Sequence, residues 1–397
     1  MDIARARPFE IRVDDGVLAD LDVRLAEARL PPEQGPTGWD AGASPAYLRD
    51  LLDHWRHHYD WRAEEARLNR FTQFRAEVRG ADVHFIPERA RNHAGGKPPL
   101  PLILTHGFPD SFTRFLKIIP MLTDPAAHGG QAEDAFDVVI PSLPWCAFSH
   151  ELRHSSGLFG VNDLWHALMT EVLGYERFCA HGGDWGSTIT EHIARSHANS
   201  VLGIHLTDVP FWHSLKTPDD LRPVEREYVE HIQRFQQEHG AYAMIQGRKP
   251  QTLADGLNDS PIGLAAWLTE KFQRWSDCEG DLNACFTRDE MITNAMVYWV
   301  TGSIGRAFMP YFDVLNAGPP RWIAEAVKQK LGSQEVPAGF AIFAKDLSHP
   351  PRAWAERFFN VRRWTEFPRG GHFAAMERPE DLARDIREFF RPMRNAQ

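Results

Sequence analysis

The chain has 397 residues, of which 43% are hydrophobic and 25% are charged, and this ordinary globular composition excludes a disordered, collagen-like or disulfide-scaffold chain. The length predicts one large elaborated domain or two smaller ones. Because 44 Lys and Arg stand against 54 Asp and Glu, the net charge is −10, and the sequence shows no local basic stripe that would let such a chain bind nucleic acid.

The first 80 residues predict a charged, helical region with one initial strand in residues 7–13. The N-terminus, MDIARARPFEIRVDDG, is charged and lacks the apolar core of a signal peptide. The longest apolar stretches have the length of strands, whereas a membrane-spanning helix needs about 20 apolar residues. We therefore expect a cytoplasmic protein without a membrane anchor.

From about residue 80 onward, apolar runs of strand length alternate with amphipathic segments of helical spacing. This alternation is typical of βαβ units and predicts a mostly parallel sheet flanked by helices. The predicted strands are residues 83–86, 100–105, 136–140, 177–180, 201–206, 339–344 and 361–364. The predicted helices between them include residues 111–122, 162–173 and 187–195.

The alternation stops after residue 206 and resumes only near residue 337. The stretch between has helical spacing, many aromatic residues and Pro/Gly breaks. An insertion at this place predicts a helical cap over the ends of the strands. The predicted division is an N-terminal wrapping region over 1–80, a first core part over 81–209, the cap over 210–335 and a second core part over 336–397.

The strand predicted over 177–180 runs into the sequence HGGDWGS and then into a helix. Small residues two positions before and after a central residue, at a sharp strand-to-helix turn, describe the nucleophile elbow of the α/β-hydrolases. The central residue here is Asp184, for which a helix N-cap is the alternative role. A serine attacking a saturated carbon would form an ether, whereas a carboxylate forms an ester that water can cleave. Asp184 therefore predicts displacement at an sp³ carbon, with an epoxide or an alkyl halide as substrate.

A second segment, HGFP at residues 106–109, follows the strand predicted over 100–105. The α/β-hydrolases place an oxyanion donor at this position. The backbone N–H groups of Phe108 and Trp185 are predicted to converge on the carbonyl oxygen that becomes anionic during ester hydrolysis.

The third segment, RGGHFAA, places His372 in a glycine-flanked loop before the last predicted helix. This is the last position in the nucleophile, acid, histidine order of the fold. The histidine needs a carboxylate that holds its tautomer. Asp346, just after the strand over 339–344, is the predicted acid, and Asp208, after the strand over 201–206, is the alternative.

No metal site or cofactor is predicted. His54, His57 and His58 could share one helix face, but no carboxylate or cysteine partner follows them, and a solvated face is favoured. The four cysteines have no metal-ligand spacing and are expected to be reduced thiols.

With these residues assembled, the chain resembles the microsomal-type epoxide hydrolases nearly end to end. The segment DWRAEEARLNRF is similar to a signature of that family's N-terminal region, and four more segments resemble family blocks: FLKIIP, GGDWGS, QGRKPQT and GGHFAAME. The resemblance implies an α/β-hydrolase fold, a small-molecule epoxide as substrate and a vicinal diol as product, formed through a covalent ester of Asp184. It is also compatible with a homodimer.

The resemblance further implies two cap tyrosines that bind the epoxide oxygen and act as the acid on ring opening. They match Tyr242 and Tyr311. A phenol with a reference pKa of about 10 can protonate the alkoxide at neutral pH. A halide leaving group needs no proton and would instead be stabilised by indole N–H donors. Two positions depart from the family pattern. Phe108 stands where the family usually has Trp, and Asp110 stands where it usually has Gly. Asp110 adds a charge near the oxyanion turn.

Two rival functions are open. A haloalkane dehalogenase shares the aspartate elbow and the histidine with its acid, but the N-terminal region and the paired tyrosines favour the epoxide hydrolase. An α/β-hydrolase scaffold that only binds would form no covalent adduct.

Overall fold

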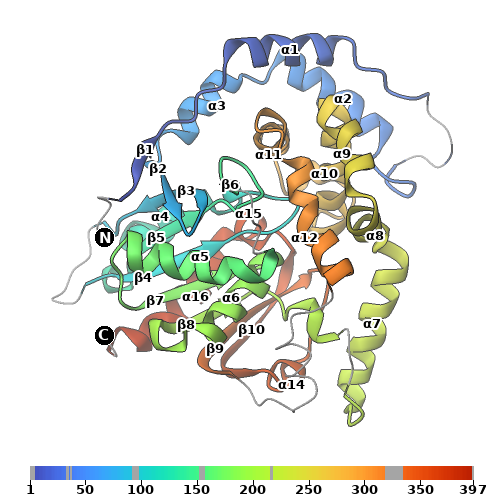
Figure 1. The fold of residues 1–397 in the computed structure, drawn as a ribbon. Coiled ribbons are helices and arrows are strands. Elements are labelled where there is room, and N and C mark those ends of the chain that lie inside the picture. Colours follow the sequence, from blue (N-terminus) through green and yellow to red (C-terminus); the bar gives the residue numbers. More distant parts are fainter. Residues whose placement is uncertain are drawn as a thin grey trace.

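In the computed structural model, a central twisted sheet carries helices on both faces, and further helices extend beyond its edge (Figure 1). The structure describes residues 5–32, 35, 38–91, 98–151, 157–214, 218–317 and 334–395. The strands of the sheet are β1 (Arg7–Phe9), β2 (Gln73–Val78), β3 (Ala81–Glu88), β4 (Leu100–Thr105), β5 (Phe136–Pro141), β6 (His150–Glu151), β7 (Phe178–Gly182), β8 (Val201–Leu206), β9 (Gln334–Lys345) and β10 (Phe359–Gly371).

The spatial order is β1-β2-β3-β5-β4-β7-β8-β9-β10, and β6 pairs with β3 off this path. The strands from β5 to β10 in this order pair in parallel, while β1, β2, β3 and β5 pair antiparallel. The predicted mostly parallel sheet is therefore confirmed. All six residues of β4, of β5 and of β8 are buried, as expected for strands covered on both faces.

One strand of the N-terminal region was not predicted. In β2, buried Phe74, Ala76 and Val78 alternate with the more exposed Arg75 and Glu77. This period of two is that of a half-buried strand, but the charged residues between the apolar ones make the segment look like part of the charged helical region.

The helices α5 (Val161–Ala167) and α6 (Trp185–Ser196) cover one face of the sheet, and α4 (Ile119–Thr123) and α16 (Pro379–Phe390) cover the other (Figure 1). The single helix predicted over residues 111–122 is wrong. A 3-10 helix, Phe112–Phe115, and the short α4 replace it, and Pro120 lies in the first turn of α4. Proline is tolerated there, whereas in the interior of one continuous helix it would break a hydrogen bond.

Beyond residue 206, the described part of the segment predicted as a cap is helical, and residues 215–217 and 318–333 lie outside the described residues. Local sequence stabilises the first turns of these helices. Three of them have proline in the first turn, and in a fourth Thr287 forms a capping box with Glu290. The cap helices are α7 (Pro223–His239), α8 (Ala241–Arg248), α9 (Pro250–Asp259), α10 (Pro261–Trp275), α11 (Arg288–Val300) and α12 (Ile304–Ala317).

The N-terminal helices α1 (Asp15–Ala26), α2 (Pro45–His57) and α3 (Trp61–Leu68) arch from the sheet edge at β1 and β2 to the cap helices (Figure 1, blue). His54 Nε2 lies 2.7 Å from an Asp289 carboxylate oxygen of α11. Within the described ranges, no cluster of side chains suited to a metal ion occurs, and none of the helices combines the length and apolarity needed to cross a membrane.

Candidate active site

Asp184 lies at the turn between β7 and α6, with φ 59° and ψ −129°. This conformation is rare for a residue with a side chain and marks a strained turn. The turn also needs close backbone approach, because a Cβ on Gly182 would lie 2.2 Å from the Gly186 carbonyl oxygen and one on Gly186 would lie 2.0 Å from that of Thr105. Gly182 and Gly186 of the HGGDWGS motif are therefore required by packing.

The two carboxylate oxygens of Asp184 have different neighbours. Oδ1 accepts the backbone N–H of Phe108 at 2.8 Å, and Oδ2 lies 3.5 Å from His372 Nε2. Phe108 belongs to the oxyanion turn, residues 106–110, which follows β4. Trp185 is the first residue of α6, so its backbone N–H is among those that a helix leaves without an internal acceptor.

The structure brings His372 and Asp346 together. His372 follows β10, Asp346 follows β9, and Nδ1 of the ring lies 2.7 Å from Asp346 Oδ1. Both side chains are buried. Burial opposes protonation of the imidazole, but the carboxylates of Asp346 and Asp184 outweigh burial and raise the pKa of His372 to about 10.

The alternative acid, Asp208, binds the elbow instead. Its Oδ1 accepts the backbone N–H of Asp184 at 3.2 Å, and its Oδ2 accepts the Ser187 hydroxyl at 2.8 Å. Burial is the main cause that raises the pKa of Asp208 to about 7, and the charge of Asp346 adds to it. The geometry thus favours Asp346 over Asp208 as the partner of His372.

The tyrosines implied by the resemblance lie on two cap helices that face each other. Tyr242 is on α8 and Tyr311 on α12, and their ring centroids are 5.9 Å apart in an edge-to-face arrangement. The Tyr311 ring lies 4.8 Å from that of Trp185 and 5.8 Å from that of Phe108. Burial is the main cause that raises the pKa of both phenols, and the charge of Asp184 adds to it. Both are therefore neutral hydrogen-bond donors at neutral pH.

Tyr298, on α11, is a third tyrosine near the oxyanion turn. It is 1% exposed and donates its hydroxyl to the backbone carbonyl of Asp110 at 2.6 Å. Tyr298 therefore belongs to the buried core.

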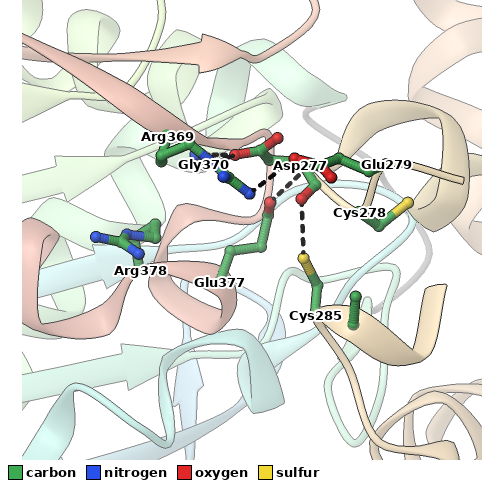
Figure 2. A pocket seen from close by; sticks show the side chains of 9 residues that line it. Asp277, Cys278, Glu279, Cys285, Arg369, Gly370, Glu377 and Arg378 are labelled. Atoms are coloured by element: carbon green, nitrogen blue, oxygen red, sulfur yellow. Dashed lines mark hydrogen bonds and ion pairs between the residues drawn. The ribbon is translucent and has the colours of Figure 1, made fainter. Parts of the chain in front are cut away.

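Glu377 was not singled out from the sequence, although it holds the His372 loop, residues 369–373. Its carboxylate accepts the backbone N–H groups of Gly371 at 3.0 Å, Phe373 at 2.9 Å and Asp277 at 2.8 Å. Figure 2 shows this carboxylate beside Asp277, at a cavity of about 220 Å³. Its place in the segment GGHFAAME was the available signal, but its partners are backbone groups, which leave no trace in the sequence.

Trp275, the last residue of α10, was also missed. Its ring centroid lies 5.4 Å from that of His372 and 5.2 Å from that of Tyr242, and its carbonyl accepts the His372 N–H at 2.7 Å. The end of a cap helix therefore contacts both the histidine and one of the two tyrosines.

The elbow, the oxyanion turn and the histidine loop at the carboxyl ends of a mostly parallel sheet define an α/β-hydrolase. In agreement, the family model described as "alpha/beta hydrolase fold" matches residues 101–263, and the model described as "Epoxide hydrolase N terminus" matches residues 6–115.

Relatives that align with nearly the whole chain identify the family more closely. The chain is 39% identical over 98% of its length to "Putative epoxide hydrolase" of Stigmatella aurantiaca (strain DW4/3-1), covering 85% of that protein, and 34% identical over 96% of its length to "Epoxide hydrolase 1" of Oryctolagus cuniculus, covering 88% of it. The structure of juvenile hormone epoxide hydrolase from the silkworm Bombyx mori matches with a TM-score of 0.86 at 26% identity, over 98% of this chain and 95% of that one. The chain belongs to the epoxide hydrolase family of the α/β-hydrolase superfamily.

Proposed function

We propose that the protein opens a small-molecule epoxide to a vicinal diol through a covalent ester of Asp184. The observation that carries the proposal is the position of the Asp184 carboxylate between the Phe108 N–H and the His372 ring, with two neutral cap tyrosines held by α8 and α12. Membership of the epoxide hydrolase family supports the same substrate class.

In the first step, Asp184 Oδ2 attacks an epoxide carbon and the bond from that carbon to the epoxide oxygen breaks. Oδ1 stays bound to the Phe108 N–H and becomes the ester carbonyl oxygen. Tyr242 and Tyr311 donate hydrogen bonds to the epoxide oxygen, and one of them transfers its proton to the alkoxide. The product of this step is a hydroxyalkyl ester and a tyrosinate.

In the second step, His372 takes a proton from water, and the hydroxide attacks the carbonyl carbon of the ester. The backbone N–H groups of Phe108 and Trp185 stabilise the oxyanion, and its collapse releases the diol and restores the Asp184 carboxylate. The proton on His372 returns through solvent to the tyrosinate. Esterification removes one of the two carboxylate charges beside His372, so the pKa of the imidazole falls and the ring can act as a base.

The test uses the variant H372Q, which keeps the nucleophile and removes the base. After incubation with styrene oxide and a panel of other epoxides, intact-mass spectrometry should show the protein plus one substrate mass, and peptide mapping should place it on Asp184. The matched control D184N should stay unmodified. An unmodified H372Q across the panel would contradict the mechanism, and release of bromide from a bromoalkane without epoxide opening would identify a dehalogenase.

We further propose that the chain divides into a wrapping region, a core and a cap, that the protein is cytoplasmic and that it forms a homodimer. Sedimentation velocity of the purified chain measures the oligomeric state, and fractionation of the native host measures the location.

A further inference from the structure

Arg114 is a buried cation that the proposed reaction does not use. It lies in the 3-10 helix after the oxyanion turn, is 2% exposed, and pairs through Nη1 with the carboxylate of Asp110, which is 1% exposed. Burial would raise the pKa of Asp110, but Arg114 and His106 together outweigh burial and lower it to about 2, so Asp110 and Arg114 are both charged at neutral pH. Burying two charges is costly, and their attraction offsets the cost only where further hydrogen bonds satisfy both groups.

The second arm of the guanidinium reaches the His372 loop. Nη2 donates to the backbone carbonyl of His372 at 2.5 Å, and the guanidinium carbon lies 5.8 Å from the ring centroid of Phe373. One side chain therefore joins two segments that are 258 positions apart in the sequence.

The same pair also holds the oxyanion turn. Asp110 Oδ1 accepts the backbone N–H of Gly107 at 3.1 Å, and the next N–H in the chain, that of Phe108, binds Asp184 Oδ1. A series of polar contacts thus runs from Gly107, the residue before the oxyanion donor, to the backbone of the histidine.

The guanidinium also packs against the elbow. A Cβ on Gly183, the residue before the nucleophile, would lie 3.1 Å from Arg114 Nη2. Arg114 therefore contacts all three segments that carry the oxyanion donor, the nucleophile and the base.

We propose that Arg114 and Asp110 are positioning residues for hydrolysis of the covalent ester, a role that rests on the proposed function. The second step needs the His372 ring, the attacking water and the Phe108 N–H in alignment at the same moment. The ion pair of Arg114 and Asp110 fixes the histidine loop and the oxyanion turn relative to each other. The first step depends on Asp184 and on tyrosines held by the cap, so it depends less on the pair. A misplacement of about 1 Å in such an alignment can cost on the order of 100-fold in rate.

The experiment measures the two steps separately in the full-length enzyme. Single turnovers of styrene oxide are stopped by acid at set times, and intact-mass spectrometry quantifies formation and decay of the ester. In R114M, ester decay should slow by about 30- to 100-fold while ester formation changes by about threefold or less, so that the ester accumulates. R114K should restore part of the decay rate, because one ammonium group can pair with Asp110 but matches the planar fork poorly.

Arg195 offers a matched control. It pairs with Glu191 four residues earlier, as Arg114 pairs with Asp110, and donates to a distant backbone carbonyl, that of Phe358, at 3.1 Å. It lies near the far end of α6, about 15 Å along the helix from the elbow. R195M should leave both steps unchanged, even where it lowers the melting temperature.

If R114M does not fold, D110N supplies the same comparison, because it preserves the shape and removes the charge. Equal slowing of both steps, slowing of ester formation alone, or no change in either step would overturn the proposal. If H372Q forms no ester at all, the proposed function itself fails, which is a different result from an ester whose decay is insensitive to Arg114.

Discussion

At the scale of single residues, Asp346 and Asp208 end neighbouring strands and carry the same functional group, yet they face different partners. Asp346 contacts the ring of His372, and Asp208 binds the elbow backbone and Ser187. D346N should therefore slow hydrolysis of the ester by about 10²- to 10⁴-fold, because the amide no longer stabilises the imidazolium. D208N should slow it far less. Single-turnover decay of the ester measures both, and a larger effect in D208N would make Asp208 the acid.

The charge of Asp184 should also be visible in the titration of His372. Two carboxylates favour the imidazolium and raise the pKa of His372 to about 10. D184N removes one of them and imitates the uncharged ester, so the pKa should fall in this variant. NMR titration of the imidazole in wild type and D184N measures the difference, with a distant histidine as internal reference. An unchanged or higher pKa in D184N would exclude this switch of His372 from acid to base.

Two of the residues that were found from the sequence share one property. Asp184 and His372 are marked by the small residues that their own turns require, so local sequence carries the signal. Asp346 was found by its place after a strand. Arg114 and Glu377 each bind a backbone group of a distant segment, that of His372 and that of Asp277, and such contacts exist only after folding. The charge of Asp110 was noted, but its partner four residues later was not.

At the scale of elements, the His372 loop is held between the core and the end of α10. Glu377 accepts three backbone N–H groups, one of which belongs to Asp277, two residues after α10. E377Q offers one acceptor oxygen instead of two, so at least one of these buried N–H groups loses its partner. We expect E377Q to lower the free energy of unfolding by about 1–3 kcal/mol.

Urea unfolding measures this loss, and single turnovers should show slower decay of the ester because the loop carries His372. The control is E366Q, on the exposed side of β10, where Glu366 accepts the indole N–H of Trp364. Its effect should stay within about 0.5 kcal/mol. Equal losses of unfolding free energy in E377Q and E366Q would contradict a role of Glu377 in holding the His372 loop.

The elements that sequence patterns predicted best are the central strands. Continuous apolar runs placed β4 and β8 with their observed bounds, because strands buried on both faces leave an uninterrupted signal. The pattern failed at β2, where charges alternate with apolar residues, and at residues 111–122, where the spacing is helical but Pro120 divides the segment.

At the scale of the whole molecule, one cluster of buried apolar side chains runs through all parts of the chain. It includes Leu51 of the N-terminal region, Phe85 and Phe340 of the sheet, and Leu264 and Phe308 of the cap helices. The sequence length left open one elaborated domain or two smaller ones. A shared core of this kind favours one cooperative unit in which the N-terminal helices fasten the cap to the sheet.

Leu51 is a fully buried residue of α2, and this helix packs on α10 and α11. L51A should lower the free energy of unfolding by about 2–4 kcal/mol, because truncation of a buried leucine loses apolar contact and leaves a cavity. The exposed ion pair between Arg24 and Asp259 joins the same two regions, and R24A should have a much smaller effect than L51A, because solvent screens the attraction between exposed charges. Urea unfolding followed by tryptophan fluorescence and by epoxide turnover should give coincident transitions in wild type and in both variants. If instead turnover in L51A survives a first fluorescence transition, the N-terminal region unfolds on its own, and the cap is held by its contacts with the sheet alone.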